Sequence, residues 1–535
     1  MIWPFGHRSC MNYNITNRFI NYAKKNPNKA AIVIPEDYNE NEVLKEKIIT
    51  FSDMEKIISQ YENGLKSRGY KKGDKIIMLT PVNLEFYACM MAMLNIGIIA
   101  VFLDPGIGLK KILHCVKDSK AKGIISVDRL LKYWPFIFSL WFKEKFSSDK
   151  KRSGISSLES LKSDKVSVLI PSHLDAHDHV LVTYTSGSTG KPKAADRNAK
   201  NVFNQINFIS KVWDCSDDVI DFPSFPMFGF MNLLYGITTV LPAIDFRKVG
   251  DVNPSVVIKQ MKKWKVTRTC GAFTFNSKII NHLESNNEQI LTLKHMALGG
   301  TPVTKAFCKT LESVYPNADC NIVYGSTEVA PISYINVNEL LEAQGSGCLV
   351  GYAFDEVQIG VVDLPASIKS FDREEESPYI CHEDVCGEVI VRAPHVVQSY
   401  INDEKGTSEN KIKSHKGDVW HRTGDTGYID NKNRLWLVGR TTDIITTSEG
   451  VIHPYPIEIK FDEMQDVRRS ALIEVDQRKV LAIECDNLDL VYQEILKTLK
   501  ALELSDVIIK PISKIPLDDR HNSKIDRIKL KTLMR

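Results

Sequence analysis

Along the first 110 positions, short runs of apolar residues alternate with segments of helical spacing. Residues 75–80 and 98–103 are continuous apolar runs that predict buried strands, and residues 83–95 predict an apolar helix that Gly97 ends. Ser52 is positioned to cap a helix over 53–68. The expected helices are 17–24, 53–68, 83–95, 201–211 and 256–264, and the expected strands are 30–35, 49–52, 75–80, 98–103 and 267–272. This alternation is typical of an α/β fold with a largely parallel sheet.

The pattern changes at residues 345–440, which are richer in strand-like runs, glycines and turn residues. Residues 387–392 and 434–438 are the clearest of these strands. They predict a small β-barrel or sandwich subdomain of about residues 345–439. From Arg440 onward the chain predicts a compact α+β tail.

Residues 133–146 are unusually aromatic. We expect a surface helix that packs on the core, followed by a loop over residues 147–165. Two alternatives remain, which are docking to a membrane surface or a partner, or a wall of an acyl channel. Basic residues follow the aromatic ones, and they are Lys143, Lys145, Lys150, Lys151 and Arg152.

The composition of the chain argues against some classes of protein but does not indicate a function. The 535 residues are 43% hydrophobic and 25% charged, with a net charge of +3, which gives no argument for nucleic acid binding. No run of about 18 apolar residues predicts a membrane span, and the start has the features of no signal peptide, although Met11 is an alternative start. Eleven scattered cysteines favour a reducing, cytoplasmic setting, and Cys381 and Cys386 lack further ligands for zinc.

The segment Tyr184-Thr-Ser-Gly-Ser-Thr-Gly-Lys-Pro-Lys193 has the composition of a phosphate-binding loop. Glycines let backbone N–H groups approach an anion, hydroxyls add donors and lysines add charge. The loop is no Walker A motif, because Gly187 and Gly190 are too close together and Pro192 follows Lys191. A Ser/Gly linker is the alternative, but the preceding strand-like run and the following lysines argue against it.

Three downstream segments complete a pattern: Tyr324-Gly-Ser-Thr-Glu328, His421-Arg-Thr-Gly-Asp-Thr-Gly427 and Arg520-His-Asn-Ser-Lys-Ile-Asp-Arg527. With the phosphate loop, they make residues 15–530 resemble the acyl-adenylate-forming superfamily, which includes acyl-CoA ligases and luciferases. The resemblance implies an AMP-binding adenylation domain over 1–439, made of two α/β subdomains and the β-rich one. It also implies a mobile C-terminal lid domain over 440–535, with a hinge about residues 441–443.

A finer likeness is to bacterial fatty acid–CoA ligases and olefin-pathway β-lactone synthetases. It rests on residues 102–106, on residues 222–228, on a hinge run over 439–450 and on residues 520–524.

The resemblance implies ATP and Mg²⁺ as cofactors, with CoA as co-substrate. It makes Lys524 the residue that activates the acid, and it makes Glu328 and Thr185 catalytic residues that also bind Mg²⁺. Chemistry agrees, since a carboxylate suits Mg²⁺, Tyr324 offers a flat face for adenine, and Asp425 can accept from both ribose hydroxyls. The residues implied in nucleotide binding are Thr185, Ser186, Gly187, Ser188, Thr189, Gly190, Lys193, Gly299, Gly300, Thr301, Tyr324, Gly325, Thr327, Asp425 and Arg440.

The expected reaction activates a fatty or other apolar acid to acyl-AMP with release of pyrophosphate, then transfers the acyl group to CoA. Three alternatives stay open: β-lactone formation from a β-hydroxy acid without CoA, transfer to a separate carrier-protein thiol, and a non-catalytic adenylate-binding scaffold. Departures from the family pattern at Ala194, Ala199, Gly229 and Thr442 bear on these alternatives.

Overall fold

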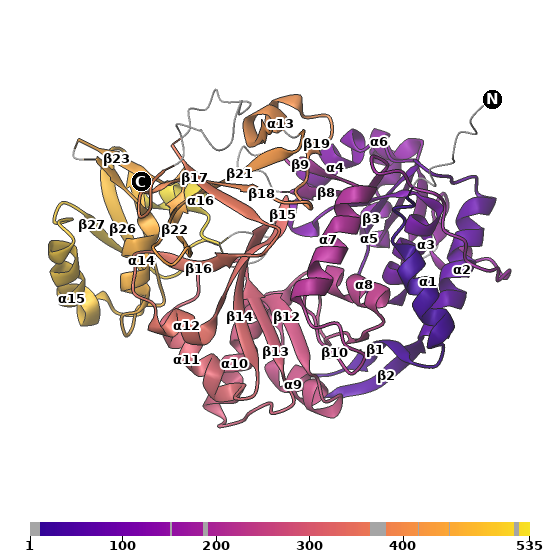
Figure 1. The fold of residues 1–535 in the computed structure, drawn as a ribbon, viewed down its shortest axis with the longest axis horizontal. Coiled ribbons are helices and arrows are strands. Elements are labelled where there is room, and N and C mark those ends of the chain that lie inside the picture. The colour runs from indigo at the N-terminus through magenta and orange to yellow at the C-terminus, as the bar shows by residue number, and fades with distance from the viewer. Residues whose placement is uncertain are drawn as a thin grey trace, which may run out of the picture. The chain divides into compact units, whose positions relative to one another are not determined.

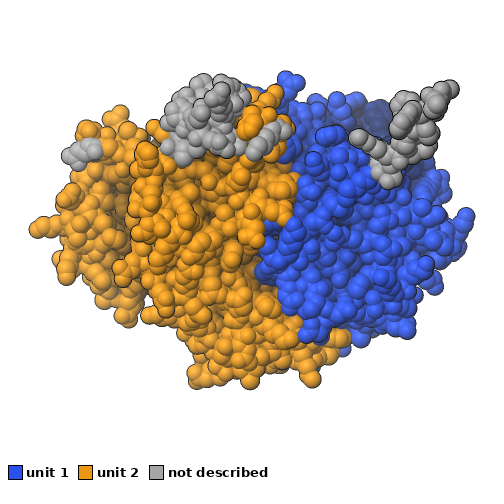
Figure 2. Space-filling view, viewed as in Figure 1, with its two compact units in different colours: residues 1–247, 397–407 blue, residues 248–396, 408–535 orange. Residues whose placement is uncertain are grey.

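The computed structural model describes residues 11–149, 152–185, 191–363, 381–415, 417–448, 450–517 and 524–535. The chain divides into two compact units, coloured separately in Figure 2. Unit 1 comprises residues 1–247 and 397–407, and unit 2 comprises residues 248–396 and 408–535. The predicted boundary between residues 439 and 440 concerns a different division and stays a prediction.

Unit 1 is built on two runs of strands. In the first, neighbours follow the order β19-β9-β8-β4-β3-β5-β6-β7, parallel from β8 to β7 and antiparallel at β9 and β19. In the second, β10, β11 and β1 are parallel neighbours and β2 pairs antiparallel with β1. The strands are β1 (Ala30–Tyr38), β2 (Val43–Thr50), β3 (Lys75–Leu79), β4 (Ile99–Phe102), β5 (Gly123–Ser126), β6 (Glu144–Ser147), β7 (Ser156–Ser157), β8 (His179–Thr185), β9 (Lys193–Asn198), β10 (Ile220–Asp221), β11 (Thr238–Val240) and β19 (Ser399–Tyr400).

The helices of unit 1 begin and end largely where the sequence predicts. Asn83 caps α3 by accepting from Phe86 N at 3.0 Å, and Gly97 ends it with a φ of 85°, which a residue with a Cβ rarely adopts. The α-helices are α1 (Thr16–Lys25), α2 (Phe51–Ser67), α3 (Leu84–Ile96), α4 (Leu109–Asp118), α5 (Asp128–Leu131), α6 (Phe138–Trp141), α7 (Ala199–Val212), α8 (Pro226–Tyr235) and α13 (Glu404–Asn410), whose last residues pass into unit 2. Short 3₁₀ helices are η1 (Pro105–Ile107), η2 (Trp134–Phe136) and η3 (Glu159–Leu161).

Two expectations for unit 1 are wrong. The cap of α2 is Thr50 rather than Ser52, because Thr50 and Asp53 each accept a hydrogen bond from the other's main-chain N–H. Residues 133–146 do not form one helix. Pro135 lies in η2, α6 has a single turn, and residues 144–147 pair with β5 as strand β6.

In unit 2 the strands follow the order β17-β18-β21-β22-β16-β15-β14-β13-β12, and β20 pairs with β21. Strands β12, β13 and β14 are parallel, and the pairs from β14 to β17 are antiparallel. Their bounds are β12 (Arg268–Ala272), β13 (His295–Gly299), β14 (Asp319–Ser326), β15 (Val329–Asn336), β16 (Cys348–Ala353), β17 (Gln358–Val362), β18 (Gly387–Arg392), β20 (Lys411–Lys413), β21 (Val419–Ile429) and β22 (Leu435–Arg440). The helices are η4 (Val249–Asp251), α9 (Pro254–Lys263), α10 (Phe273–Ser285), α11 (Lys305–Val314) and α12 (Val337–Glu342).

The β-rich part of unit 2 is strand-rich as expected, but its described strands do not close into a barrel. β16 pairs on one side with β22 and on the other with β15, so the antiparallel strands continue into the parallel ones. A strand that already has two neighbours cannot also pair with β17, so the sheet stays open.

The last hundred residues form the expected α+β tail. β25 (Arg469–Val475), β26 (Arg478–Glu484) and β27 (Ile508–Ile512) make a three-stranded sheet, and β23 (Ile445–Thr447) pairs with β24 (Gly450–Ile452). Alternate residues of β25 face opposite sides. Helices α14 (Pro454–Asp462), α15 (Leu488–Ala501) and α16 (Arg527–Met534) belong to the same tail (Figure 1). Leu472 packs with residues of α14 and α15, while Ile473 packs with residues of α16.

No described helix has the length and apolar composition needed to cross a membrane. The ten described cysteines are free thiols, and the described residues contain no group of three or more His, Cys, Asp or Glu side chains arranged to hold a metal.

Candidate functional site

Three of the predicted site residues in unit 2 are bonded directly to one another. The Tyr324 hydroxyl donates to Asp425 Oδ2 at 2.5 Å, and Arg440 Nε lies 2.9 Å from Asp425 Oδ1. We call Tyr324, Asp425 and Arg440 the Asp425 clamp. Each carboxylate oxygen has a second lone pair, so the clamp fixes the carboxylate and leaves acceptor capacity for two further donors.

Strand pairing sets the position of the clamp. Asp425 of β21 pairs with Arg440 of β22. The residue before Asp425 is Gly424, whose φ is positive. The Asp425 N–H donates to Thr423 Oγ1 at 3.1 Å, and Arg440 Nη1 donates to Thr423 O at 3.4 Å. The main chain therefore fixes both charged side chains.

The charges of the clamp shift the ionisation of its members. Burial and the adjacent Asp425 carboxylate raise the pKa of Tyr324 well above its ordinary value, so the phenol stays protonated as a donor. Burial lowers the pKa of Arg440, but Asp425 together with Tyr455, Tyr324 and Asp443 raises it by more, so the net shift is upward. Tyr324 therefore acts on the carboxylate as a neutral hydrogen-bond donor, and Arg440 acts on it as a cation.

Tyr324 also begins the turn that carries the predicted metal-binding residue. Ser326 of β14 pairs with Val329 of β15, so Thr327 and Glu328 are the two residues of a tight hairpin turn, and both are partly buried. A Cβ at Gly325 would lie 3.2 Å from Val329 O, which explains the glycine. The turn holds the Glu328 carboxylate four residues from the clamp tyrosine.

The predicted adenine-side residues follow β13, the neighbour of β14. A Cβ on Gly299 would lie 2.5 Å from Val323 O, so only glycine allows this approach of the two strands. Gly300 has a φ of 95° and open space around its missing Cβ, and Thr301 follows it, partly buried. The structure therefore lines up Gly299 beside the residue that precedes Tyr324.

The phosphate loop belongs to unit 1. Residues 186–190, with Ser186, Gly187, Ser188, Thr189 and Gly190, lie outside the described residues. Thr185 at the end of β8 pairs with Lys193 at the start of antiparallel β9, so the loop is a hairpin connection. The Lys193 side chain is buried, with Nζ 5.3 Å from the Tyr400 ring. A Walker A loop leads into a helix, so this connection agrees with the exclusion made from spacing.

Lys524 is exposed and directly precedes two fixed points of the chain. Ile525 forms a bridge with Leu517, and α16 begins at Arg527. Arg527 Nε lies 3.0 Å from Asp443 Oδ2, in the turn where the hinge is predicted. The Asp443 N–H donates to Arg440 O at 3.0 Å, so this turn starts at the clamp arginine.

Two residues at the site, Tyr455 and Thr423, are not among the predicted site residues. Tyr455 of α14 has a pKa raised by burial and by Asp425, with Arg440 opposing the rise, and Pro454 lies 3.1 Å from the Cβ position of Gly439. Thr423, in the Arg-Thr-Gly-Asp segment, accepts from the main chain of Asp425 as described above. The role of Tyr455 depends on tertiary contacts that local spacing does not reveal, whereas Thr423 acts on Asp425 from two residues away.

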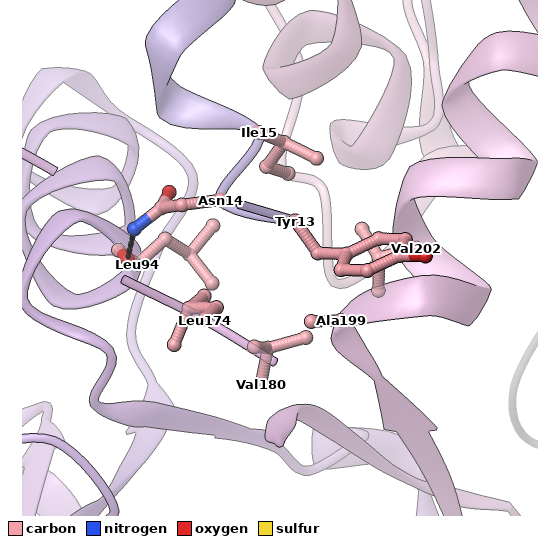
Figure 3. Close-up of a pocket in the computed structure, with 8 residues that line it drawn as sticks. All are labelled: Tyr13, Asn14, Ile15, Leu94, Leu174, Val180, Ala199 and Val202. Carbon is pink, nitrogen blue, oxygen red and sulfur yellow. Dashed lines mark hydrogen bonds between the residues drawn. The ribbon is translucent and has the colours of Figure 1, made fainter. Parts of the chain in front are cut away.

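Three of the four residues that depart from the family pattern, Ala194, Ala199 and Gly229, lie in unit 1, where packing surrounds them. Ala194 is buried in a core cluster with Tyr184, and Ala199 lines an apolar cavity of about 10 Å³, room for at most one water (Figure 3). A Cβ at Gly229 would lie 2.5 Å from the hydroxyl oxygen of Tyr87, which fills the space beside α8.

Comparisons with known proteins agree with these motifs. The olefin β-lactone synthetase of Stenotrophomonas maltophilia is 26% identical over 554 residues, 97% of each chain, and the 2-succinylbenzoate–CoA ligase of Bacillus cytotoxicus is 25% identical over 425 residues, 78% of each. The structure of the amide bond synthetase McbA from Marinactinospora thermotolerans superposes with a TM-score of 0.79 at 17% identity, covering 98% of this chain and 99% of that one.

A family model described as AMP-binding enzyme matches residues 19–401. Because this match spans more than half of the 535 residues, the chain belongs to the AMP-binding enzyme family, within the acyl-adenylate-forming superfamily.

Proposed function

We propose that this enzyme activates a fatty or other apolar carboxylic acid with ATP. A carboxylate oxygen of the acid attacks the α-phosphorus of ATP, the bond to the β-phosphate oxygen breaks, and acyl-AMP and pyrophosphate form. The observation that carries the proposal is the Asp425 clamp, because it presents a fixed carboxylate with two free acceptor positions. Ribose offers two adjacent hydroxyl donors that suit such an acceptor.

The contacts to the base and ribose would come from unit 2, and those to the β- and γ-phosphates from unit 1. The hydroxyl of Tyr324 is engaged with Asp425, so its ring is held in one orientation and offers adenine a face to stack on. Gly299, Gly300 and Thr301 would border the base, and Arg440 would reach the ribose or the α-phosphate. In unit 1, residues 185–190 with Lys193 would hold the β- and γ-phosphates until pyrophosphate leaves.

Mg²⁺ suits this donor set. It prefers oxygen ligands, keeps several waters and is usually held by one or two carboxylates together with substrate phosphates. Glu328, held in a hairpin turn with partial burial, fits that role, and Thr185 would add its hydroxyl. When bound, the ion would neutralise charge on the phosphates. Thr327 and Gly325 fix the turn that orients the carboxylate.

Lys524 is proposed to stabilise the charge that develops between the attacking carboxylate and the α-phosphate. Replacing Lys524 by alanine should abolish pyrophosphate release and leave the second step intact when acyl-AMP is supplied. Lys529→Ala, an exposed lysine of α16, is the matched control. Equal loss of both steps in Lys524→Ala would contradict the assignment, and it would also remove the reason for a hinge at residues 441–443.

For the second step we propose two acceptors. Transfer to CoA is the general case among ligase relatives. Closure of a β-hydroxyl onto its own acyl-AMP, giving a β-lactone, is favoured by the likeness to an olefin β-lactone synthetase over 97% of each chain. A separate carrier-protein thiol is a third acceptor class.

One assay separates these functions. Pyrophosphate release is measured with fatty and β-hydroxy fatty acids, with and without CoA, and the acyl product is identified. A CoA-dependent thioester supports the ligase, and a CoA-independent β-lactone supports the synthetase. Release in the absence of either product would point to another acceptor.

The same assay tests the clamp. Asp425→Asn should lose most pyrophosphate release, because the amide keeps only one acceptor oxygen and its NH₂ group cannot accept from the second of the two donors, Tyr324 and Arg440. Tyr428→Phe, on the same strand, should retain it, since its hydroxyl only accepts from Ser346 N at 3.0 Å. No release by the wild-type protein with any acid would overturn the proposed function.

A further inference from the structure

The segment of residues 133–142 exposes aromatic rings on the surface of unit 1. Phe136 and Phe142 are 86% and 85% exposed, and Phe138 is 70% exposed. Tyr133 and Trp141 are each 51% exposed. We call these five residues the aromatic surface. Isolated exposed apolar residues are ordinary on a soluble protein, but five large rings within ten residues are not.

The exposure is built into the fold rather than caused by a loose segment. Leu140 is buried in the core cluster of unit 1, and Trp134 and Ile137 pack against that cluster. These residues alternate with the exposed rings, so each inward residue fixes the outward position of its neighbours. Sequence alone would allow the rings to fold inward, and the structure turns them outward.

The exposed rings also contact one another. Phe138 lies 5.4 Å from Trp141 and 5.9 Å from Phe142, centroid to centroid. The Trp141 indole N–H donates to Pro135 O at 3.1 Å, so its polar group is already satisfied by the segment itself. Phe138, Trp141 and Phe142 therefore form one apolar cluster, and the indole N–H of Trp141 needs no hydrogen-bond partner from outside.

Lys143 and Lys145 follow the rings in sequence, and their ammonium groups donate hydrogen bonds to main-chain oxygens of unit 1. Lys145 Nζ donates to Leu140 O at 3.0 Å and to Lys143 O at 2.6 Å, and it lies 4.5 Å from the Trp134 ring. Lys143 Nζ donates to Ala121 O, and Arg152 pairs with Asp128. These three cations are thus engaged by the protein.

Other cations surround the aromatic surface. Lys132 lies 4.9 Å from the Tyr133 ring, and Arg129 is exposed on α5. Helix α4 lies beside α6 (Figure 1) and exposes Lys110 and Lys117, with Leu109 56% exposed at its start.

The nearby carboxylates point elsewhere. Asp128 is buried and paired with Arg152, and the Asp118 carboxylate accepts from the Tyr184 hydroxyl at 2.6 Å. Glu144 is partly buried and raises the pKa of Tyr70, after burial itself, so it faces the interior. The charge presented around the rings is therefore positive.

We propose that the aromatic surface docks onto an anionic lipid bilayer. Phe and Trp rings favour the headgroup region, and lysine and arginine at their edge are attracted to acidic lipids. Apolar insertion and electrostatic attraction together make the two signals that stable peripheral binding needs. The single-turn helix α6 is far too short to span the membrane, so the protein lies on its surface.

Vesicle flotation with the full chain tests the proposal. The probes are vesicles of phosphatidylcholine alone and of phosphatidylcholine mixed with phosphatidylserine. The wild-type protein should bind the mixed vesicles preferentially, and added salt should weaken the binding. Absence of binding to the mixed vesicles, or equal binding to both kinds, would overturn the proposal.

Two sets of variants separate the contributions. Phe136→Ser/Phe138→Ser/Phe142→Ser should weaken binding by about a hundred-fold or more, since three rings no longer insert. A second variant, Lys110→Glu/Lys117→Glu/Lys132→Glu, should weaken it by a similar factor of about a hundred. Unchanged binding in either variant would contradict the proposal.

The matched control is Val168→Ser/Ile170→Ser, which removes exposed apolar residues of unit 1 outside the aromatic surface, 80% and 72% exposed. It should bind vesicles as the wild type does. All variants change exposed side chains, so their melting temperatures should match that of the wild type. If the aromatic variant instead converts a wild-type dimer to a monomer in light scattering, the surface binds a second copy and the proposal fails.

Discussion

Replacing Arg527 by methionine should loosen the C-terminal sheet, because it leaves a buried carboxylate without its partner. Arg527 Nη2 donates to both Glu458 oxygens, at 2.7 and 2.8 Å, and Nη1 donates to Leu472 O at 2.8 Å. The Glu458 side chain is 7% exposed and that of Arg527 is 9% exposed. Methionine fills similar space but supplies none of these donors.

The magnitude follows from the burial of the pair. Removing one partner of a buried ion pair costs about 3–5 kcal/mol, because the other charge stays in a poorly solvated site. Leu472 N–H still donates to Glu458 Oε1 at 2.7 Å, which favours the lower end of this range. At about 1.4 kcal/mol per factor of ten, local opening should become roughly 150-fold to 5,000-fold more frequent.

Hydrogen exchange of the β25 and β26 amides measures this opening directly. The variant should exchange faster there while the amides of unit 1 exchange as before. Burial raises the pKa of Glu458 even beside Arg527, so the orphaned carboxyl can take up a proton at low pH. A folded-state pKa above the unfolded one means that stability is lost as pH rises, so the effect should be larger at pH 8 than at pH 5.

Two control variants test whether the loss of stability comes from the buried ion pair. Arg468→Met removes an arginine that is 45% exposed from its pair with Asp486, and exchange of the β25 and β26 amides should stay close to that of the wild type because water screens this pair. Glu458→Met/Arg527→Met removes both buried charges and should recover much of the stability. Exchange of the β25 amides in Arg527→Met within about ten-fold of the wild type would refute the reasoning.

Three further predictions follow from single contacts. Tyr324→Phe removes a hydrogen bond to the Asp425 carboxylate that is worth about 1.5–3 kcal/mol. The KM for ATP in pyrophosphate exchange should therefore rise roughly ten-fold or more. An unchanged KM would contradict the role of the clamp. Burial raises the pKa of Asp462 to about 7, so the stability that this group contributes below its unfolded pKa is lost as pH rises toward 7. Asp462→Asn should remove up to about 4 kcal/mol of this pH dependence, measured by urea unfolding. An equal pH dependence in the variant and the wild type would contradict the prediction. Gly229→Ala should lower the melting temperature by an overpacking cost of about 1–3 kcal/mol against Tyr87, and a Tyr87→Leu background should relieve it.

Local sequence signals predicted much of the fold. The strand at residues 75–80 appears as β3 over 75–79, and the helix at 83–95 appears as α3 with Asn83 and Gly97 at its ends. These elements follow from apolar runs, a side-chain cap and a glycine with positive φ, all of which act within a few residues. The open arrangement of β16 and β22 did not follow, because pairing depends on partners almost ninety residues apart.

The candidate site divides in the same way. Motifs identified Tyr324, Asp425 and Arg440 separately, but the hydrogen bond between Tyr324 and Asp425 joins residues 101 positions apart. Sequence therefore suggested a stacking face for Tyr324 and did not reveal that its hydroxyl fixes the carboxylate. The same limit hid the link from Asp443 through Arg527 toward Lys524. Spacing identifies the participants, and only tertiary contacts assign their geometry.

The scaffold hypothesis rested on Ala194 and Ala199, and both alanines are buried in unit 1. Ala194 is buried within a core cluster, and Tyr87 occupies the space that a side chain at residue 229 would need. Neither change touches the Asp425 clamp, whose three members keep their hydrogen bonds and charges. Burying a charged or polar group costs free energy, so a site that no longer binds its ligand is expected to lose such groups first. A buried carboxylate that retains two donors is the arrangement we expect of a nucleotide-binding site, and it argues against the scaffold hypothesis.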